Sequence, residues 1–319
     1  MLKNILLCAL FSDYFSGSYQ YYYGPSRVSI SSGNSYICDS VFMNFLGSES
    51  GSAIYMSQQT FYVVVEKCSF FECSLSNSNS GGAVYLNVKG SVVSNVCSKS
   101  CITGSGGQGQ FAYLCVSAGE KNFFMQSSIT SSISVSPKWA LYQIKGAQNI
   151  ISCNFSKNSL QQGPVALITE SSSHNMSFTT MHECVCYNSI GIWIFGCSSV
   201  SLYRNNILQC DSPSQGFICN EAVYSKMTEC CFVGNKGPIV GVYTGTMEMY
   251  YCYTDVFSHA YGAPKTYNLI ISSYLHSLVH FNTYFCPAEN NEIVMKTKDT
   301  KLQTRNILRI LTLLLALQD

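Results

Sequence analysis

A short apolar segment recurs along most of this chain, and its spacing drifts downward from 30 to 22 residues. Anchored on Ala83 in the stretch GGAVY, the segment occurs at positions 53, 83, 112, 140, 166, 192, 218 and 240, about every 27 residues. One unit of this length cannot bury its own apolar face, so successive units must stack on one another. The repeat therefore predicts a solenoid in which each unit contacts its neighbours.

A second column, of apolar residues followed by cysteine, runs in phase with the first. Its cysteines are Cys38, Cys68, Cys97, Cys153, Cys184, Cys230 and Cys252. Three segments continue as C-x-F-x-x-N or C-x-F-x-x-C, and they begin at Cys68, Cys153 and Cys230. These three cysteines are 85 and 77 residues apart, about three repeats each. We therefore predict that the column is one internal stack, in which cysteine serves as a small buried apolar residue.

The stretches within each repeat are short, rich in β-branched and aromatic residues, and separated by Ser, Asn and Gly. They are too short for packed helices, whereas parallel strands can pair from one repeat to the next. Connections between parallel strands are almost always right-handed. We therefore expect an all-β fold, a right-handed parallel β-helix over residues 26–286 with about nine or ten coils. Gly and Asn should occupy its sharp corners, and stacked Asn side chains should bond from coil to coil.

The N-terminal end lies outside this repeat. In residues 1–18, Lys3 precedes an apolar run and several small residues, which is the pattern of a short signal peptide; the alternative is an N-terminal cap. N-glycosylation sequons begin at Asn154 and Asn175 and are compatible with export. These features favour a secreted or cell-surface protein.

The C-terminal tail, residues 287–319, contains an apolar segment from Ile307 to Leu317. Its 11 residues are too few to span a bilayer, which needs about 20. We expect a short helix that covers the end of the domain. A lipid-anchor signal, with membrane association through this segment, is the alternative.

Composition limits the partners and cofactors. Only 11% of the residues are charged and the net charge is +1, so no basic surface is expected for a nucleic acid. The 17 cysteines lack the paired spacing of a zinc site. The GSGGQG string at residues 104–109 precedes another predicted strand rather than a helix, which argues against a dinucleotide site. We expect no cofactor and no metal.

Carboxylates decide whether the chain is an enzyme, because glycoside hydrolysis needs two acids on one face. Glu183 and Glu229 each precede a cysteine of the second column, so we expect them to share a phase about two coils, or about 10 Å, apart. That separation exceeds the range of about 6.5–9.5 Å typical of inverting enzymes. We predict that the protein is not an enzyme, with Glu183 and Glu229 as the catalytic pair if it is one.

Two tetrapeptides of the repeat carry a resemblance to known proteins. Gly81-Gly82-Ala83-Val84 matches a GGA[ILV] motif, and residues 155–158 and 232–235 match FxxN, although Cys73 stands where that motif has Asn. The chain thereby resembles the polymorphic outer-membrane proteins of chlamydiae and similar surface proteins of trichomonad protists. The resemblance implies a right-handed, pectin-lyase-like β-helix on the cell surface, with a role in adhesion. It brings no catalytic residues to carry over.

These observations predict a non-enzymatic, secreted or cell-surface protein that binds an unknown protein or glycan. Its binding face would be a flank rich in Tyr, Ser and Asn, which provide rigid aromatic contacts and adaptable hydrogen bonds. The tyrosine-rich run from Tyr19 to Tyr23 could contribute or could cover the first coil. The alternatives are a polysaccharide lyase or glycoside hydrolase of the same fold, and a purely structural repeat segment.

Overall fold

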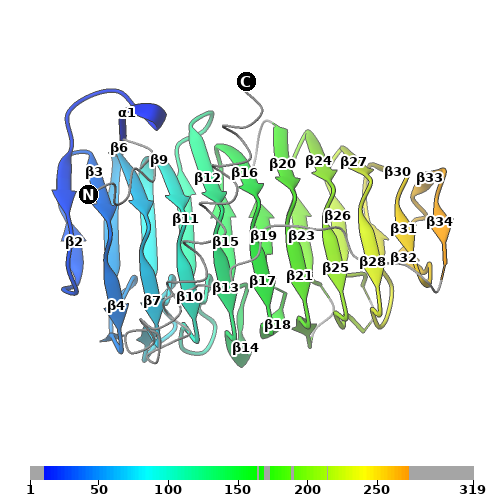
Figure 1. Cartoon of the computed structure of the whole chain (residues 1–319), viewed down its shortest axis with the longest axis horizontal. Coiled ribbons are helices and arrows are strands. Elements are labelled where there is room, and N and C mark those ends of the chain that lie inside the picture. Colours follow the sequence, from blue (N-terminus) through cyan, green and yellow to red (C-terminus); the bar gives the residue numbers. More distant parts are fainter. Residues whose placement is uncertain (1–10, 164, 169–172, 188–189, 214, 273–319) are drawn as a thin grey trace, which may run out of the picture.

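The chain forms a parallel β-solenoid, which confirms the predicted fold class (Figure 1). The computed structural model describes residues 11–163, 165–168, 173–187, 190–213 and 215–272. It has about 8 turns of about 26 residues, fewer than the nine or ten expected. The last strand, β34 (Ile270–Ile271), has only 2 residues. The predicted helix at residues 307–317 lies outside the described residues, as do residues 1–10 of the predicted signal peptide or cap.

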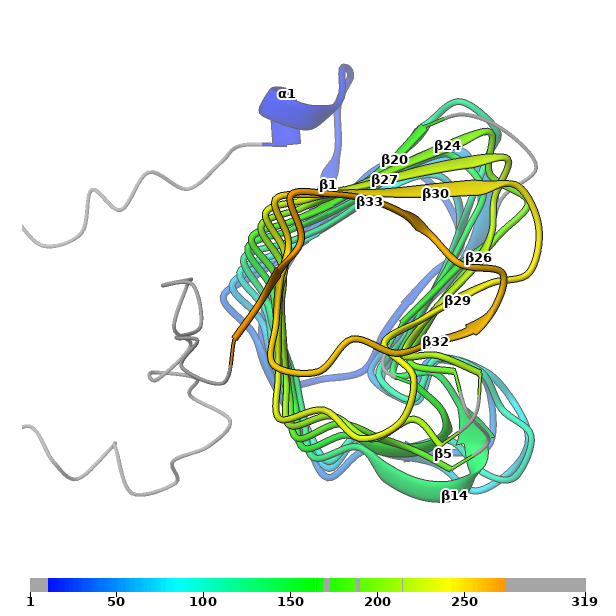
Figure 2. The same cartoon turned by 90° about the vertical axis from the view of Figure 1, so that its right-hand side faces the viewer.

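Each turn places strands on three faces around the axis (Figure 2). The first and second faces together form a 19-stranded sheet, and the third face is a 10-stranded sheet. The first face contains β2 (Val28–Ile30), the starts of β6 (Ile54–Glu66) and β9 (Val84–Ser94), β11 (Ala112–Val116), β15 (Leu141–Ile144), β19 (Val165–Ile168), β23 (Ile192–Phe195), β26 (Ile218–Glu221), β29 (Val240–Val242) and β32 (His259–Tyr261). The second contains β1 (Gln20–Tyr22), β3 (Ser35–Cys38), the ends of β6 and β9, β12 (Lys121–Met125), β16 (Ala147–Ile151), β20 (Ser173–Ser177), β24 (Ser199–Tyr203), β27 (Tyr224–Thr228), β30 (Thr246–Tyr250) and β33 (Lys265–Tyr267).

The third face contains β4 (Val41–Met43), β7 (Ser69–Phe71), β10 (Cys97–Lys99), β13 (Ser128–Thr130), β17 (Asn154–Ser156), β21 (Thr180–His182), β25 (Asn206–Leu208), β28 (Cys231–Val233), β31 (Tyr253–Thr254) and β34. Short strands follow it in some turns: β5 (Leu46–Gly47), β8 (Ser74–Leu75), β14 (Ile133–Lys138), β18 (Ser159–Gln162) and β22 (Val185–Cys186). The one helix in the described part is α1 (Phe11–Tyr14), which lies against the second face (Figure 2).

The first repeated column is confirmed to within one residue. The paired residues at the start of the first face are Ile54, Val84, Ala112, Leu141, Val165, Ile192, Ile218 and Val240. The predicted anchors at 53, 83, 140 and 166 are therefore one residue out of register. Ala53, Ala83 and Ala140 are also fully buried, one residue before the strand. Because the two adjacent buried columns have similar composition, the sequence pattern does not distinguish between registers that differ by one residue.

Phenylalanines of the FxxN-like segments share one buried column inside the third face. Phe42 pairs with Phe70, and Phe155 and Phe232 occupy the same column in later turns. The rings of Phe42 and Phe70 are 5.0 Å apart and nearly parallel, at 12°. All four side chains are fully buried. Offset stacking of this kind stabilises the column beyond the burial of apolar area.

Two corners in each turn hold one residue at positive φ. The first corner joins the second face to the third, and the second corner follows the third face. The first contains Asp39, Lys67, Asn95, Gln126, Ser152, Phe178, Arg204, Glu229, Tyr251 and Asn268, and the second contains Asn44, Glu72, Ser100, Ser131, Lys157, Glu183, Gln209 and Gly234. At these two corners the expectation that Gly and Asn occupy the corners is therefore wrong for most turns. It is right for the corner before the first face in several turns, where Gly51, Gly81 and Gly109 have positive φ. The backbone at the first and second corners is held by ladder hydrogen bonds, such as the one from the Lys67 N–H to the Ser94 carbonyl, at 3.1 Å. These bonds offset a left-handed conformation that costs about 1–2 kcal/mol.

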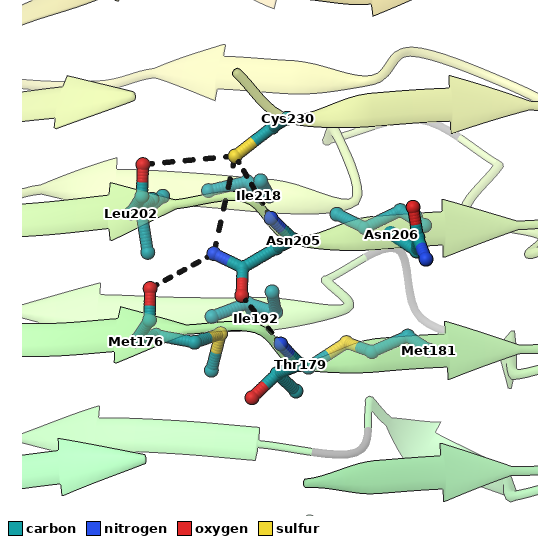
Figure 3. Close-up of a pocket in the computed structure, with 10 residues that line it drawn as sticks. Met176, Thr179, Met181, Ile192, Leu202, Asn205, Asn206, Ile218 and Cys230 are labelled. Carbon is teal, nitrogen blue, oxygen red and sulfur yellow. Dashed lines mark hydrogen bonds between the residues drawn. The ribbon is translucent and has the colours of Figure 1, made fainter. Parts of the chain in front are cut away.

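We call the residue immediately after each of these corners the capping position, because at many of them the side chain bonds to the corner of the preceding turn. Asn205 shows the pattern (Figure 3): its Oδ1 accepts a hydrogen bond from the Thr179 N–H at 3.0 Å, and its Nδ2 donates to the Met176 carbonyl at 2.9 Å. Asn158 makes the same two bonds to Ser132 and Ile129, at 3.1 and 2.9 Å. The capping side chain thus satisfies backbone groups that the corner leaves unpaired.

The capping positions also correct the predicted cysteine column, which is in fact two columns. After the first corner the capping residues are Ser40, Cys68, Val96, Ser127, Cys153, Thr179, Asn205, Cys230 and Cys252. After the second corner they are Phe45, Cys73, Cys101, Ser132, Asn158, Cys184, Cys210 and Asn235. Cys184 therefore belongs with Cys73, whereas Cys38 and Cys97 belong to neither column. The prediction that Cys73 takes the place of an Asn is confirmed.

One inward column of the second face is mostly polar, although Val63, Val200 and Met247 also belong to it. It contains the buried residues Ser35, Ser91, Asn122, Gln148, His174 and Ser225. The Asn122 amide donates to the Leu114 and Ile144 carbonyls, both at 3.2 Å, which ties the second face to the first. His174 is 2% exposed, and burial lowers its pKa to about 4, opposed by the nearby Gln148 backbone. The folded protein therefore holds this imidazole neutral at mildly acidic pH.

We expect Asn205→Leu to destabilise the protein by about 2–4 kcal/mol, because it leaves the Thr179 N–H and the Met176 carbonyl buried without partners. Asn205→Thr should cost clearly less, since Thr179 fills the same position one turn earlier. Urea unfolding followed by far-UV circular dichroism measures both variants. Equal losses for Leu and Thr would show that the cap contributes nothing specific.

His174 makes stability depend on pH. Above pH 6.5 both folded and unfolded states hold it neutral; between pH 6.5 and about 4 only the unfolded state binds the proton. This group should therefore lower the free energy of unfolding as the pH falls through that window, by up to about 3 kcal/mol below pH 4. His174→Val, which copies Val200 in the next turn, should flatten the profile measured by urea titration. An unchanged profile would contradict the assignment.

Candidate functional site

Glu183 and Glu229, the candidate catalytic pair, lie at different corners. Glu183 follows β21 at the second corner, and Glu229 follows β27 at the first corner. The expectation that they share one phase is therefore wrong, and the error came from merging the two capping columns. Each acid contacts a neighbouring base: Glu183 lies 3.5 Å from His182 Nε2, and Glu229 accepts a 2.5 Å bond from Arg204 Nε. They do not converge on a common reaction site.

The capping thiols are buried and held as hydrogen-bond donors. Cys153 Sγ donates to the Phe124 carbonyl at 3.4 Å, and Cys68 Sγ to the Glu66 carbonyl at 3.3 Å. Burial raises the pKa of both thiols to about 12, so they stay protonated at neutral pH. Within the described ranges, no three His, Cys, Asp or Glu side chains gather closely enough to hold a metal ion.

Both sequons lie in paired strands rather than in loops. Asn154 begins β17 and pairs with Ser128 and Thr180, and it is half-buried. Asn175 lies in β20 on the outer side of the second face, where its Nδ2 contacts Ser177 Oγ at 3.3 Å. Neither position has the loop setting that usually suits a glycan acceptor.

A cavity inside the coil does not provide a ligand site. It is lined mostly by apolar side chains, together with Thr179, Asn205, Asn206 and Cys230 (Figure 3). Its volume is about 10 Å³, space for one water at most. The Asn205 amide that borders it already bonds to Thr179 and Met176. We interpret this cavity as a packing void.

The outer side of the second face is covered in its N-terminal turns. Phe11 of α1 and Phe15 are buried there with Tyr36, Val64 and Val92. Phe15 stacks on Tyr62, with ring centroids 4.4 Å apart, and the Lys121 ammonium donates to the Tyr14 carbonyl at 2.7 Å. Residues of the predicted 1–18 segment thus pack on the solenoid. The Tyr19–Tyr23 run continues into β1, with Tyr21 and Tyr23 exposed.

The C-terminal turns of the same face carry polar and aromatic side chains on their outer side, and we call this region the open half. It consists of Asn149, Asn175, Ser201, Lys226, Glu248 and Lys265, flanked by Tyr203, Tyr224, Tyr250 and Tyr267. These positions alternate with buried ones such as Leu202, Met227 and Met249. The strands therefore present a polar, aromatic outer side whose rungs repeat every ~4.8 Å.

Contacts within the open half hold its tyrosines in place. The hydroxyls of Tyr224 and Tyr250 both donate to Glu248 Oε2 at 2.8 Å, and these bonds lower the pKa of Glu248. Tyr250 also stacks on Tyr267, 4.5 Å away and nearly parallel. The Lys226 ammonium lies 4.9 Å from the Tyr250 ring centroid. Rigid aromatic side chains lose little entropy when a ligand binds.

The open half contains Tyr, Ser and Asn side chains, as expected of the predicted flank, together with Lys226, Glu248 and Lys265, and the sequence argument had not named these residues. The signal that could have located them is the alternation in segments such as YSKMT and TMEMY, where methionines take the inward positions. Among the residues that the structure describes, no helix has the length and apolar composition needed to span a membrane. No family model, curated protein or solved structure matches the chain.

The buried thiols predict a clear order of reactivity. In native protein at pH 8, iodoacetamide should modify the half-buried Cys115 before Cys68 or Cys153, whose thiolate fractions are about 1,000-fold below those of free thiols. Unfolding in guanidinium should make all three react alike. Peptide mass spectrometry under non-reducing conditions reads out each site. Disulfides at Cys68 and Cys153 would contradict the capping role.

Proposed function

We propose that this protein is a non-enzymatic binding protein that acts in secreted form or at a cell surface, and that its ligand is a protein or glycan bound by the open half. The observation that carries the proposal is the change along one face. The N-terminal turns are sealed by α1 and Phe15, whereas the C-terminal turns expose Ser201, Lys226 and Tyr267.

The composition of the open half supports binding rather than packing. Its outer columns carry amide, hydroxyl and ammonium groups on rigid strands, which position donors and acceptors better than loops do. Tyr267 is 41% exposed and presents apolar area beside these groups. Such a mixture is typical of surfaces that bind polar ligands with adaptable hydrogen bonds.

The arrangement of the acids favours this proposal over a polysaccharide lyase or glycoside hydrolase. Glu183 and Glu229 lie at different corners, and each contacts a basic side chain. The acid of the open half, Glu248, is bonded to two tyrosines. Hydrolysis of a glycosidic bond needs two carboxyl groups about 5–10 Å apart across the substrate.

The finer relationship, to pectin-lyase-like β-helices and to the chlamydial and trichomonad surface proteins, is also a proposal. The motif residues support it, because Asn158 and Asn235 of the FxxN segments cap corners and Phe155 and Phe232 are fully buried in the core. Surface display and adhesion follow from that relationship.

The test is a binding screen of the labelled full chain on arrays of defined glycans and of extracellular-matrix proteins. We expect saturable binding that Ser201→Trp weakens at least about tenfold by blocking the open half. The control Ser29→Trp places the same ring on an exposed strand residue of the first face and should leave binding unchanged.

Equal binding by both tryptophan variants would contradict the assignment of the face, and no binding to either array would contradict the function. Turnover of a polysaccharide that is abolished by Glu183→Gln or Glu229→Gln would overturn the non-enzymatic interpretation.

A further inference from the structure

A carboxylate on the first face lies among aromatic side chains, on a different side of the coil from the open half. Glu221 ends β26, between Phe195 of β23 in the preceding turn and Tyr243, which follows β29 in the next. The inward neighbours Ile194, Asn220 and Val242 are buried in the core. Strand alternation therefore directs Phe195, Glu221 and Tyr243 outward.

The contacts bring two more rings to this carboxylate. The Trp193 indole N–H donates to Glu221 Oε1 at 2.9 Å, and the Trp193 and Phe195 ring centroids are 5.2 Å apart. On the other side, Tyr243 packs on Tyr261 with centroids 4.0 Å apart. Phe195 is 43% exposed and Tyr261 is 62% exposed. Two aromatic pairs thus flank one acid, and the pairs are about two rungs, or about 10 Å, apart.

The negative charge of Glu221 has only neutral donors near it in the part of the chain that the structure describes. These are the Trp193 indole and the Cys219 thiol, and both contact Oε1. Burial, followed by the Glu221 charge, raises the pKa of the Cys219 thiol to about 12, so this thiol stays a neutral donor at neutral pH. Glu248 and Glu229, in contrast, lie close to basic side chains.

We propose that the cluster of Trp193, Phe195, Glu221, Tyr243 and Tyr261 binds an organic ammonium group. Ring faces attract a cation through their quadrupoles, and an adjacent carboxylate adds a direct charge interaction. An inorganic divalent cation fits poorly, because it requires several oxygen ligands and the cluster supplies one carboxylate. An anion is repelled by Glu221. The cluster therefore matches an amine that carries apolar substituents, from either a quaternary ammonium compound or a primary alkylamine such as a lysine side chain.

Trp193 gives the site its own reporter, because the chain has 2 tryptophans and the other, Trp139, stacks on it at 5.7 Å. Tryptophan fluorescence should be followed while tetramethylammonium or methylammonium chloride is added at constant ionic strength with sodium chloride. We expect a saturable change with a Kd on the order of 1 mM. A tighter response to tetramethylammonium assigns a quaternary ligand, and a tighter response to methylammonium assigns a primary amine.

Glu221→Gln keeps the size of the side chain and should weaken binding about tenfold, as should Phe195→Ala, which removes an exposed ring. Glu72→Gln is the matched control, because Glu72 is an exposed acid at the second corner of an early turn, outside both proposed sites, and this variant should bind like the original protein. Far-UV circular dichroism checks that each variant is folded. The absence of a saturable change in the unmodified chain, or undiminished binding by both site variants, would overturn the proposal. The outcome is independent of the open half, because no residue is shared.

Discussion

The hydrogen bond from a capping side chain to the corner of the preceding turn is the interaction on which this solenoid depends. A strand ladder alone pairs the flat faces, but each corner leaves an N–H and a carbonyl pointing inward, where no water can satisfy them. Asn158, Asn205 and Asn235 satisfy both groups with one amide. Ser, Thr and Cys perform part of the same task elsewhere, for example where Thr179 accepts from the Cys153 N–H. Many turns therefore depend on the following turn to satisfy the backbone groups at their corners.

Because inward-pointing side chains stabilise the coil, the outward-pointing residues of the strands are free to vary. Inward columns must match one another in size, as Phe42 and Phe70 do, whereas outward columns need only tolerate water or a covering segment. The second face shows both outcomes, with Val64 and Val92 beneath α1 and Ser201 and Lys226 uncovered. The first face shows a third, the stacked rings of Tyr55, Tyr85, Tyr113 and Tyr142. The faces of these rings contact one another, so they are less available to a ligand than Phe195 or Tyr261.

The sequence predicted the features that depend on stacking and missed those that depend on backbone geometry. Like residues recur where they stack, so the period, the parallel fold and the equivalence of Cys73 and Asn158 could be read directly. Cys184 was assigned to the wrong corner because Met-x-x-Cys precedes it just as it precedes Cys230, and a short motif does not record which corner it follows. Most of the positive-φ residues at the two capped corners were not predicted, because Lys67, Phe178 and Glu229 are residue types that rarely adopt that conformation. The residue types of the open half were predicted, but its position was not. Alternation of inward and outward residues along a strand does not indicate which outward columns another segment covers.

The use of thiols as caps ties this fold to the order of events during its biosynthesis. A capping cysteine works only as a thiol, because the S–H of Cys153 or Cys184 must reach a backbone carbonyl. In a newly made chain these sulfurs are open to oxidants, and a bond formed at that stage would hold a cap away from its corner. Once the coil has closed, the same sulfurs are enclosed. If this chain passes through an oxidising compartment, the solenoid has to fold faster than its cysteines form disulfides. The yield of folded protein then depends on the ratio of these two rates.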